Sequence, residues 1–174
     1  MADLNGKNIA IIATNGFEDS ELTSPKEAVE SAGATTKVVS TETGEIEGKK
    51  GAKVAVDAKT ADASVDEFDA LILPGGTINA DTIRTDADAV ALVKAFKDAG
   101  KPIGVICHGG WILADADLLK GVKLTSVANV KTDLANAGAN WVDEKVVVDS
   151  GFISSRTPDD LPAFNATLVE EFAK

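Results

Sequence analysis

The chemistry that this sequence offers is concentrated in one adjacent pair, Cys107-His108, the only cysteine and the only histidine among its 174 residues. A thiolate is a strong nucleophile and an imidazole can take up a thiol proton, so the pair is suited to attack on a carbonyl carbon. Adjacent residues on a sharp turn point their side chains in different directions, so the spacing does not by itself guarantee a direct hydrogen bond. The pair therefore predicts a nucleophile and leaves open what orients its base.

The segment around Cys107 is typical of a strand that turns sharply into a helix. The apolar run 103–106 precedes it, and Gly109-Gly110 and the helix-like residues 111–114 follow. Such an elbow exposes the side chain at its apex, and the start of a helix favours a thiolate. Gly109 fits the common elbow pattern, whereas Val105 stands where that pattern has a small residue. The alternative is that Cys107 only fills space in the core.

Three further features are candidate partners of this pair. Gly75-Gly76 follows an apolar run, and its amides together with that of His108 could stabilise an oxyanion. Glu18 is a candidate hydrogen-bond partner of the Cys107 sulfur, which requires a shared proton, and Asp81 is a candidate to orient the imidazole. The alternatives are an ordinary turn at Gly75-Gly76 and carboxylates that are solvated or stabilise helix N-termini.

The elements that must position these residues alternate between strands and helices. This order predicts an α/β fold with a mostly parallel sheet covered on both faces. The carboxyl ends of parallel strands share one edge, so Glu18, Gly75-Gly76 and Cys107 are expected to meet there. The predicted strands are 7–14, 35–40, 70–73, 103–106 and a short one at 123–125, with a hairpin of 146–149 and 152–155 and an antiparallel excursion over 41–57. The predicted helices are 25–32 (capped by Ser24, with Pro25 first), 86–99, 108–115, 129–137 and 158–174.

The composition excludes several classes of function. With 28 acidic and 17 basic residues the net charge is −11, which disfavours nucleic acid and anionic membrane as direct partners. No run spans a bilayer and the N-terminus lacks signal-peptide features, so we expect a single cytoplasmic domain over residues 1–174. One cysteine allows no internal disulfide, and one cysteine with one histidine disfavours a structural zinc site. Neither a phosphate loop nor a dinucleotide-binding motif is complete, so no cofactor is expected.

Four separated motifs resemble those of the PfpI/ThiJ family of intracellular cysteine proteases and stress-related deglycases, within the class I glutamine amidotransferase-like superfamily. They are residues 17–21 (FEDSE), 73–76 (LPGG), 106–109 (ICHG) and 154–161 (SSRTPDDL), and the resemblance covers nearly the whole chain in order. It implies a flavodoxin-like three-layer α/β/α sandwich with a nucleophile elbow.

The resemblance also implies roles for single residues. Cys107 matches the family's nucleophile, His108 its neighbouring histidine, and Glu18 the acid that contacts the sulfur. Asp81 matches, across a one-residue gap, the acid that a neighbouring subunit supplies to the histidine in protease-like members, where glutamate is found. Gly110 stands where many relatives have proline. A homo-oligomer, either a dimer or a hexamer, is therefore expected.

Together these observations predict a cysteine-dependent hydrolase, either a peptidase or a deglycase or glyoxalase-like enzyme related to stress. Its substrate would be a peptide or a glycated, aldehyde-derived compound. The alternative function is a redox-sensing stress protein whose Cys107 is oxidised without hydrolytic turnover. A third is a flavodoxin-like binding domain.

Overall fold

The computed structural model describes residues 2–174. It contains β1 (Asn8–Ile12), β2 (Thr35–Ser40), β3 (Gly44–Glu47), β4 (Lys53–Val56), β5 (Ala58–Lys59), β6 (Ala70–Leu73), β7 (Ile103–Ile106), β8 (Lys123–Leu124), β9 (Asn140–Trp141), β10 (Val147–Asp149) and β11 (Phe152–Ser155). The α-helices are α1 (Asp19–Ser31), α2 (Thr77–Ile83), α3 (Ala87–Asp98), α4 (Trp111–Asp115), α5 (Lys131–Asn136) and α6 (Leu161–Phe172). Short 3₁₀ turns lie at Val65–Glu67, Cys107–Gly110, Ala128–Val130 and Pro158–Asp160.

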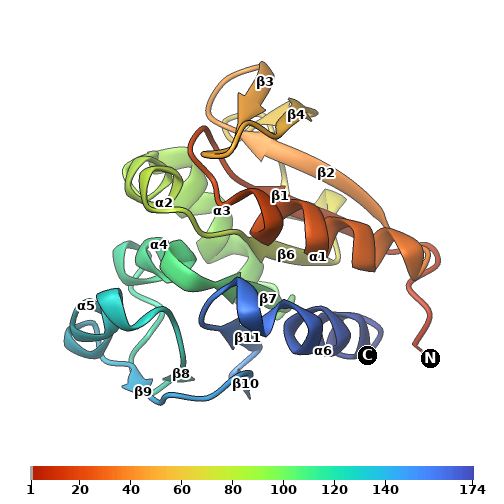
Figure 1. The fold of residues 1–174 in the computed structure, drawn as a ribbon. Helices are drawn as coiled ribbons and strands as arrows, with labels where there is room; N and C mark the ends of the chain where they lie inside the picture. The colour runs from red at the N-terminus through yellow and green to blue at the C-terminus, as the bar shows by residue number, and fades with distance from the viewer. Residues whose placement is uncertain (1) are drawn as a thin grey trace.

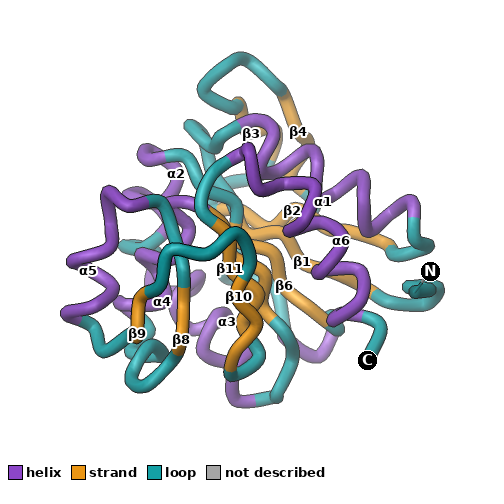
Figure 2. Tube along the Cα trace, turned by 60° about the horizontal axis from the view of Figure 1, so that its bottom comes forward, coloured by secondary structure: helices purple, strands orange, loops and turns teal. Residues whose placement is uncertain are grey.

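A seven-stranded sheet in the order β10-β11-β7-β6-β1-β2-β5 forms the centre of the molecule (Figure 1). All neighbouring strands in it run parallel except β10, which pairs antiparallel with β11. The predicted mostly parallel sheet and the predicted C-terminal hairpin are therefore confirmed. The antiparallel hairpin β3–β4 and the parallel pair β8–β9 lie at opposite ends of the molecule (Figure 2).

Different helices cover the two faces of this sheet (Figure 1). In β1, Ile9 and Ile11 pack in one apolar cluster with residues of α1 and α6, whereas Ala10 and Ile12 pack in another with residues of α3 and α4. Successive side chains of a strand point to opposite faces, so an unbroken apolar run suits a sheet that is buried on both sides. The predicted three-layer α/β/α arrangement is confirmed.

The first helix begins earlier than the sequence predicted. The expected cap at Ser24 is wrong, because α1 begins at Asp19 and contains Pro25 in its interior. The chain before α1 is fixed by tertiary hydrogen bonds: Glu18 N donates to Gly75 O at 3.2 Å and Lys49 N donates to Phe17 O at 2.9 Å. These long-range bonds set the start of the helix, and a local capping pattern cannot reveal them.

Two other segments differ from prediction. Helix α2 was not predicted; it starts directly after Gly76, whose φ of 92° ends the preceding turn. The helix predicted over 108–115 is divided into the 3₁₀ turn Cys107–Gly110 and the short α4. Both differences lie in the segments that follow β6 and β7, next to Cys107.

Within residues 2–174, none of the helices combines the length and the apolar character that crossing a membrane requires.

Candidate functional site

The carboxyl edge of the sheet brings the predicted residues together. Strands β1, β6 and β7 are consecutive in the sheet, so the segments that follow them meet at this edge. These segments carry Glu18, Gly75-Gly76 and Cys107-His108 respectively, and the expected convergence is confirmed. It follows from parallel strand direction alone.

Cys107 occupies the apex of the turn that follows β7. Its φ is 60°, in the left-handed region that non-glycine residues rarely adopt. The side chain is partly buried, and the thiol is free. Gly109 allows the turn to lie against the loop after β6, since a Cβ on it would approach Leu73 O at 2.6 Å. The backbone strain at a lone thiol is the feature expected of a nucleophile elbow.

His108 contacts the thiol directly, which the sequence had left open. Its Nδ1 lies 3.3 Å from Cys107 Sγ, and its Nε2 lies 3.3 Å from Thr77 Oγ1, at the start of α2. The ring also packs edge-on against Trp111, with centroids 5.4 Å apart. Burial, and after it the positive charge of Lys49, lowers the pKa of His108, so the imidazole is neutral and able to accept a proton near pH 7.

The carboxyl group beside Cys107 belongs to Glu21, and the expected contact of Glu18 with the sulfur is not found. Glu18 instead forms ion pairs with Lys49 at 2.5 Å and Lys50 at 2.9 Å, in the turn between β3 and β4. Although burial alone would raise it, the two lysines hold the pKa of Glu18 below its usual value. The physical reason is the early start of α1: Glu18 precedes the helix in extended conformation, whereas Glu21 lies in the first turn, on the buried face.

Glu21 is completely buried in the α1 face that packs on the sheet. A Cβ placed on Gly75 would clash with Glu21 Oε1 and lie 2.8 Å from Cys107 Cβ, so these two side chains flank the same glycine. Neither carboxyl oxygen has a hydrogen-bond partner of normal geometry among residues 2–174. Such a group is costly to bury as an anion, which favours its protonated form.

Glu21 and Cys107 are electrostatically coupled. Burial, followed by the negative charge of Glu18, raises the pKa of Glu21 from 4.5 to about 7. Burial, followed by the charge of Glu21, raises the pKa of the Cys107 thiol to about 12. A proton on Glu21 removes this repulsion.

The backbone around Gly75-Gly76 lies where the sequence predicted an oxyanion site. The backbone N–H groups of His108 and Gly76 act against the rise in the Cys107 thiol pKa that burial causes first and Glu21 second. The loop is fixed by the buried Asn79, whose amide donates to Gly75 O at 3.0 Å and whose Oδ1 accepts from Thr14 N at 2.7 Å. Two oriented amides beside a nucleophile can stabilise negative charge that develops next to it.

Asp81 lies apart from His108 within this chain. It is exposed on α2, and no carboxylate of residues 2–174 hydrogen-bonds to either nitrogen of the imidazole. Nε2 of His108, the nitrogen that an acid would contact, faces Thr77 Oγ1 instead. Thr77 and Glu21 are thus the functional candidates that the sequence did not single out.

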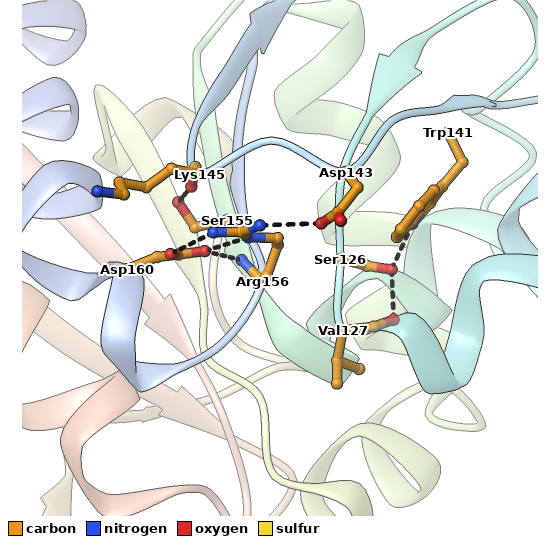
Figure 3. Close-up of polar contacts among 8 residues, drawn as sticks. All are labelled: Ser126, Val127, Trp141, Asp143, Lys145, Ser155, Arg156 and Asp160. Carbon is orange, nitrogen blue, oxygen red and sulfur yellow. Dashed lines mark hydrogen bonds and ion pairs between the residues drawn. The ribbon is translucent and has the colours of Figure 1, made fainter.

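The loop after β11 lies beside the Cys107 turn, because β11 pairs parallel with β7. Arg156 in this loop is held by the buried Asp160 through Nε–Oδ2 at 2.8 Å and Nη2–Oδ1 at 3.0 Å, and its Nη1 donates to Asp143 Oδ1 at 2.9 Å (Figure 3). A bidentate pair with a buried carboxylate fixes the guanidinium geometry. The motif SSRTPDDL therefore fixes the conformation of the loop after β11.

A cavity of about 350 Å³ adjoins Arg156 and Asp143. Its wall includes Ser126 and Trp141, joined by a hydrogen bond from Trp141 Nε1 to Ser126 Oγ at 2.8 Å (Figure 3). The complete lining is Ser126, Val127, Ala128, Asn129, Trp141, Asp143, Arg156 and Thr157. A larger groove of about 470 Å³ between α1 and β4 contains none of the predicted site residues.

Among residues 2–174, no group of three or more histidine, cysteine, aspartate or glutamate side chains is arranged to hold a metal ion.

Relatives of this chain are found among known proteins by sequence and by fold. A family model described as the DJ-1/PfpI family matches residues 7–171. An uncharacterized protein of Staphylococcus saprophyticus is 51% identical over 168 residues, which cover 95% of this chain and 97% of that protein. An uncharacterized protein of Staphylococcus aureus is 48% identical, with 95% of this chain and 98% of that protein covered.

Solved structures share the fold. A ThiJ/PfpI domain protein from Brachyspira murdochii has a TM-score of 0.89 and 29% identity, over 98% of this chain and 97% of its own. A two-domain protein from Anabaena variabilis, with DJ-1/ThiJ/PfpI-like and ferritin-like domains, has a TM-score of 0.92 and 33% identity over 94% of this chain. This chain spans 47% of that protein. The shared architecture confirms the predicted flavodoxin-like fold.

Proposed function

Because this chain belongs to the DJ-1/PfpI family, we propose that it is a cytoplasmic, cysteine-dependent hydrolase, either a peptidase or a deglycase-like enzyme with a role in stress. The observation that carries the proposal is the geometry of Cys107: a thiol at a strained φ of 60°, with the imidazole Nδ1 of His108 at 3.3 Å. A buried structural cysteine needs neither the strain nor the base.

In the proposed reaction, Sγ of Cys107 attacks the carbonyl carbon of a peptide; the same addition to a glycated, aldehyde-derived carbonyl, which has no leaving group, would give a hemithioacetal instead of the acyl-enzyme described next. The thiol proton passes to Nδ1 of His108, and the amides of His108 and Gly76 stabilise the oxyanion. Collapse of the tetrahedral adduct breaks the bond to the leaving group, which takes the proton from His108. Water then hydrolyses the acyl-enzyme and restores the thiol.

Replacing the nucleophile tests this proposal. Cys107→Ser is expected to lower turnover of peptide, methylglyoxal and glycated substrates by about three orders of magnitude, because a serine hydroxyl is far less acidic than a thiol. Initial rates of wild type and variant on the same substrate panel provide the measurement. Equal rates in both would rule out catalysis by Cys107. Rapid oxidation of Cys107 by mild peroxide, with no turnover of any substrate, would favour the redox-sensing alternative.

We further propose that the protein acts as a homo-oligomer in which Asp81 of a second copy supports the imidazole. Asp81→Asn should then lower kcat about tenfold or more, whereas Asp88→Asn, an exposed aspartate on the next helix, should leave it unchanged. Mixing the Asp81→Asn chain with the inactive Cys107→Ser chain should restore part of the activity, since a mixed dimer holds one site with both groups. Failure of the mixture to regain activity would refute a role for Asp81 across subunits.

A further inference from the structure

The imidazole of His108 is held between two side chains of its own chain. Nδ1 faces Cys107 Sγ and Nε2 faces Thr77 Oγ1, each at 3.3 Å. Thr77 is the first residue of α2, directly after Gly76, so the loop that supplies a backbone amide to the sulfur also positions this hydroxyl. The three side chains form a line from thiol to imidazole to hydroxyl.

We propose that Thr77 is a positioning residue that keeps a proton on Nε2 of His108 and thereby leaves Nδ1 free to accept the proton of Cys107. The inference rests on the proposed function, whose base it specifies. A neutral imidazole has one N–H and one bare nitrogen, and the hydrogen bond at one nitrogen decides which form is present. With Nε2–H donated to Thr77 Oγ1, the bare nitrogen is the one that faces the thiol.

Proton transfer then conserves this arrangement. The proton leaves Sγ for Nδ1, which gives a thiolate and an imidazolium with both nitrogens protonated. Nε2–H still donates to Oγ1, and that hydrogen bond becomes stronger because its donor is now charged. Thr77 therefore stabilises the ion pair more than the neutral pair. Its own O–H remains free to donate to a carboxylate, which is how Asp81 of a second copy would act on His108.

The other groups around His108 do not replace Thr77 in this role. The Trp111 ring lies nearly perpendicular to the imidazole, and the guanidinium of Arg84 lies 5.2 Å from the centroid of the Trp111 ring and is paired with Asp115. These groups hold the plane of the imidazole but accept no proton from Nε2.

The remaining charges that face the site are farther along its edge. Lys49 contributes a positive charge that opposes protonation of the imidazole, and Glu21 lies beside Gly75, next to Cys107. Asp133 is engaged by Trp111 Nε1 at 2.9 Å, and Asp81 is exposed. Thr77 is thus the acceptor for Nε2–H within residues 2–174.

The test uses the fact that the chain has one histidine and one cysteine. Nitrogen-15 NMR of the full-length protein reports the tautomer of His108, and the rate of iodoacetamide alkylation against pH reports thiolate formation at Cys107. Thr77→Val keeps the side-chain shape of an exposed residue and removes its hydroxyl, which is the acceptor for Nε2–H. It should shift the imidazole away from the Nε2–H form and slow alkylation at pH 7 about five- to tenfold. Thr77→Ser should stay within about twofold of wild type, and so should Thr82→Val on the same helix.

An unchanged tautomer and an unchanged alkylation profile in Thr77→Val would overturn the inference. Neither measurement requires substrate, so absence of hydrolysis would count against the proposed function while the role of Thr77 is still decided. Circular dichroism and thermal melting of each variant confirm that the comparison is made between folded proteins.

Discussion

A Gly76→Ala variant is expected to lose at least about 3 kcal/mol of unfolding free energy. Gly76 has a φ of 92°, where any side chain strains the backbone. A Cβ there would also lie 2.5 Å from Gly16 O and 2.7 Å from Phe17 C, and closer still to Glu18 N. These atoms are backbone and cannot rotate away, so the loop after β1 must shift. Urea unfolding followed by fluorescence or circular dichroism measures the loss.

Gly100→Ala is the matched control for this variant. Gly100 also has a positive φ, of 70°, but a Cβ on it would meet no atom within 4 Å. Gly100→Ala therefore introduces the backbone strain without a steric clash, and it should lower the unfolding free energy by about 1 kcal/mol. If the two variants were equally destabilised, the close approach of the loops after β1 and β6 would not be the reason that Gly76 is needed.

The stability of the wild type relative to Glu21→Gln is expected to fall by about 2.5 kcal/mol as the pH rises from 5 to 8. Burial, and then the charge of Glu18, raises the pKa of Glu21 from 4.5 to about 7 in the folded protein. Between these values the folded state binds the proton and the unfolded state does not, so folding loses stability with rising pH. Glutamine has the same shape as glutamate but does not titrate. The unfolding free energy of Glu21→Gln therefore does not show this fall with rising pH.

The measurement is the difference in unfolding free energy between the two proteins at several pH values, which cancels the contributions of other titrating groups. Glu27→Gln, on the exposed side of the same helix, is the matched control for loss of a carboxylate. A difference that stays constant from pH 5 to 8 would mean that Glu21 is not held protonated by its burial.

Most of the fold could be predicted because its signals are local. The strands of the sheet are short apolar runs bounded by glycine, proline or polar residues, and the order of strands and helices implies parallel pairing. The start of α1 could not be predicted in this way. Ser24-Pro25 forms a good local cap, but the hydrogen bonds of Phe17 and Glu18 to distant loops determine where the helix begins.

The early start of α1 also explains why Glu21, and not the predicted Glu18, lies beside Cys107. Once α1 begins at Asp19, the buried positions 21, 25 and 29 share one helical face, and Glu21 is its one charged member. A carboxylate on an otherwise apolar stripe was therefore the signal that could have identified it. The contact of Thr77 with His108 had no such signal, because it depends on the unpredicted α2 and on the direction of the turn after β7.

The left-handed backbone of Cys107 has a consequence for how this sequence can change over evolutionary time. Glycine would relieve the strain at that position, so drift under selection for folding alone would replace the cysteine. A lineage that retains it accepts a small, permanent loss of stability in every molecule. Retention of cysteine at this turn in a wide sample of orthologues would then be evidence of selection on the thiol, independent of any assay.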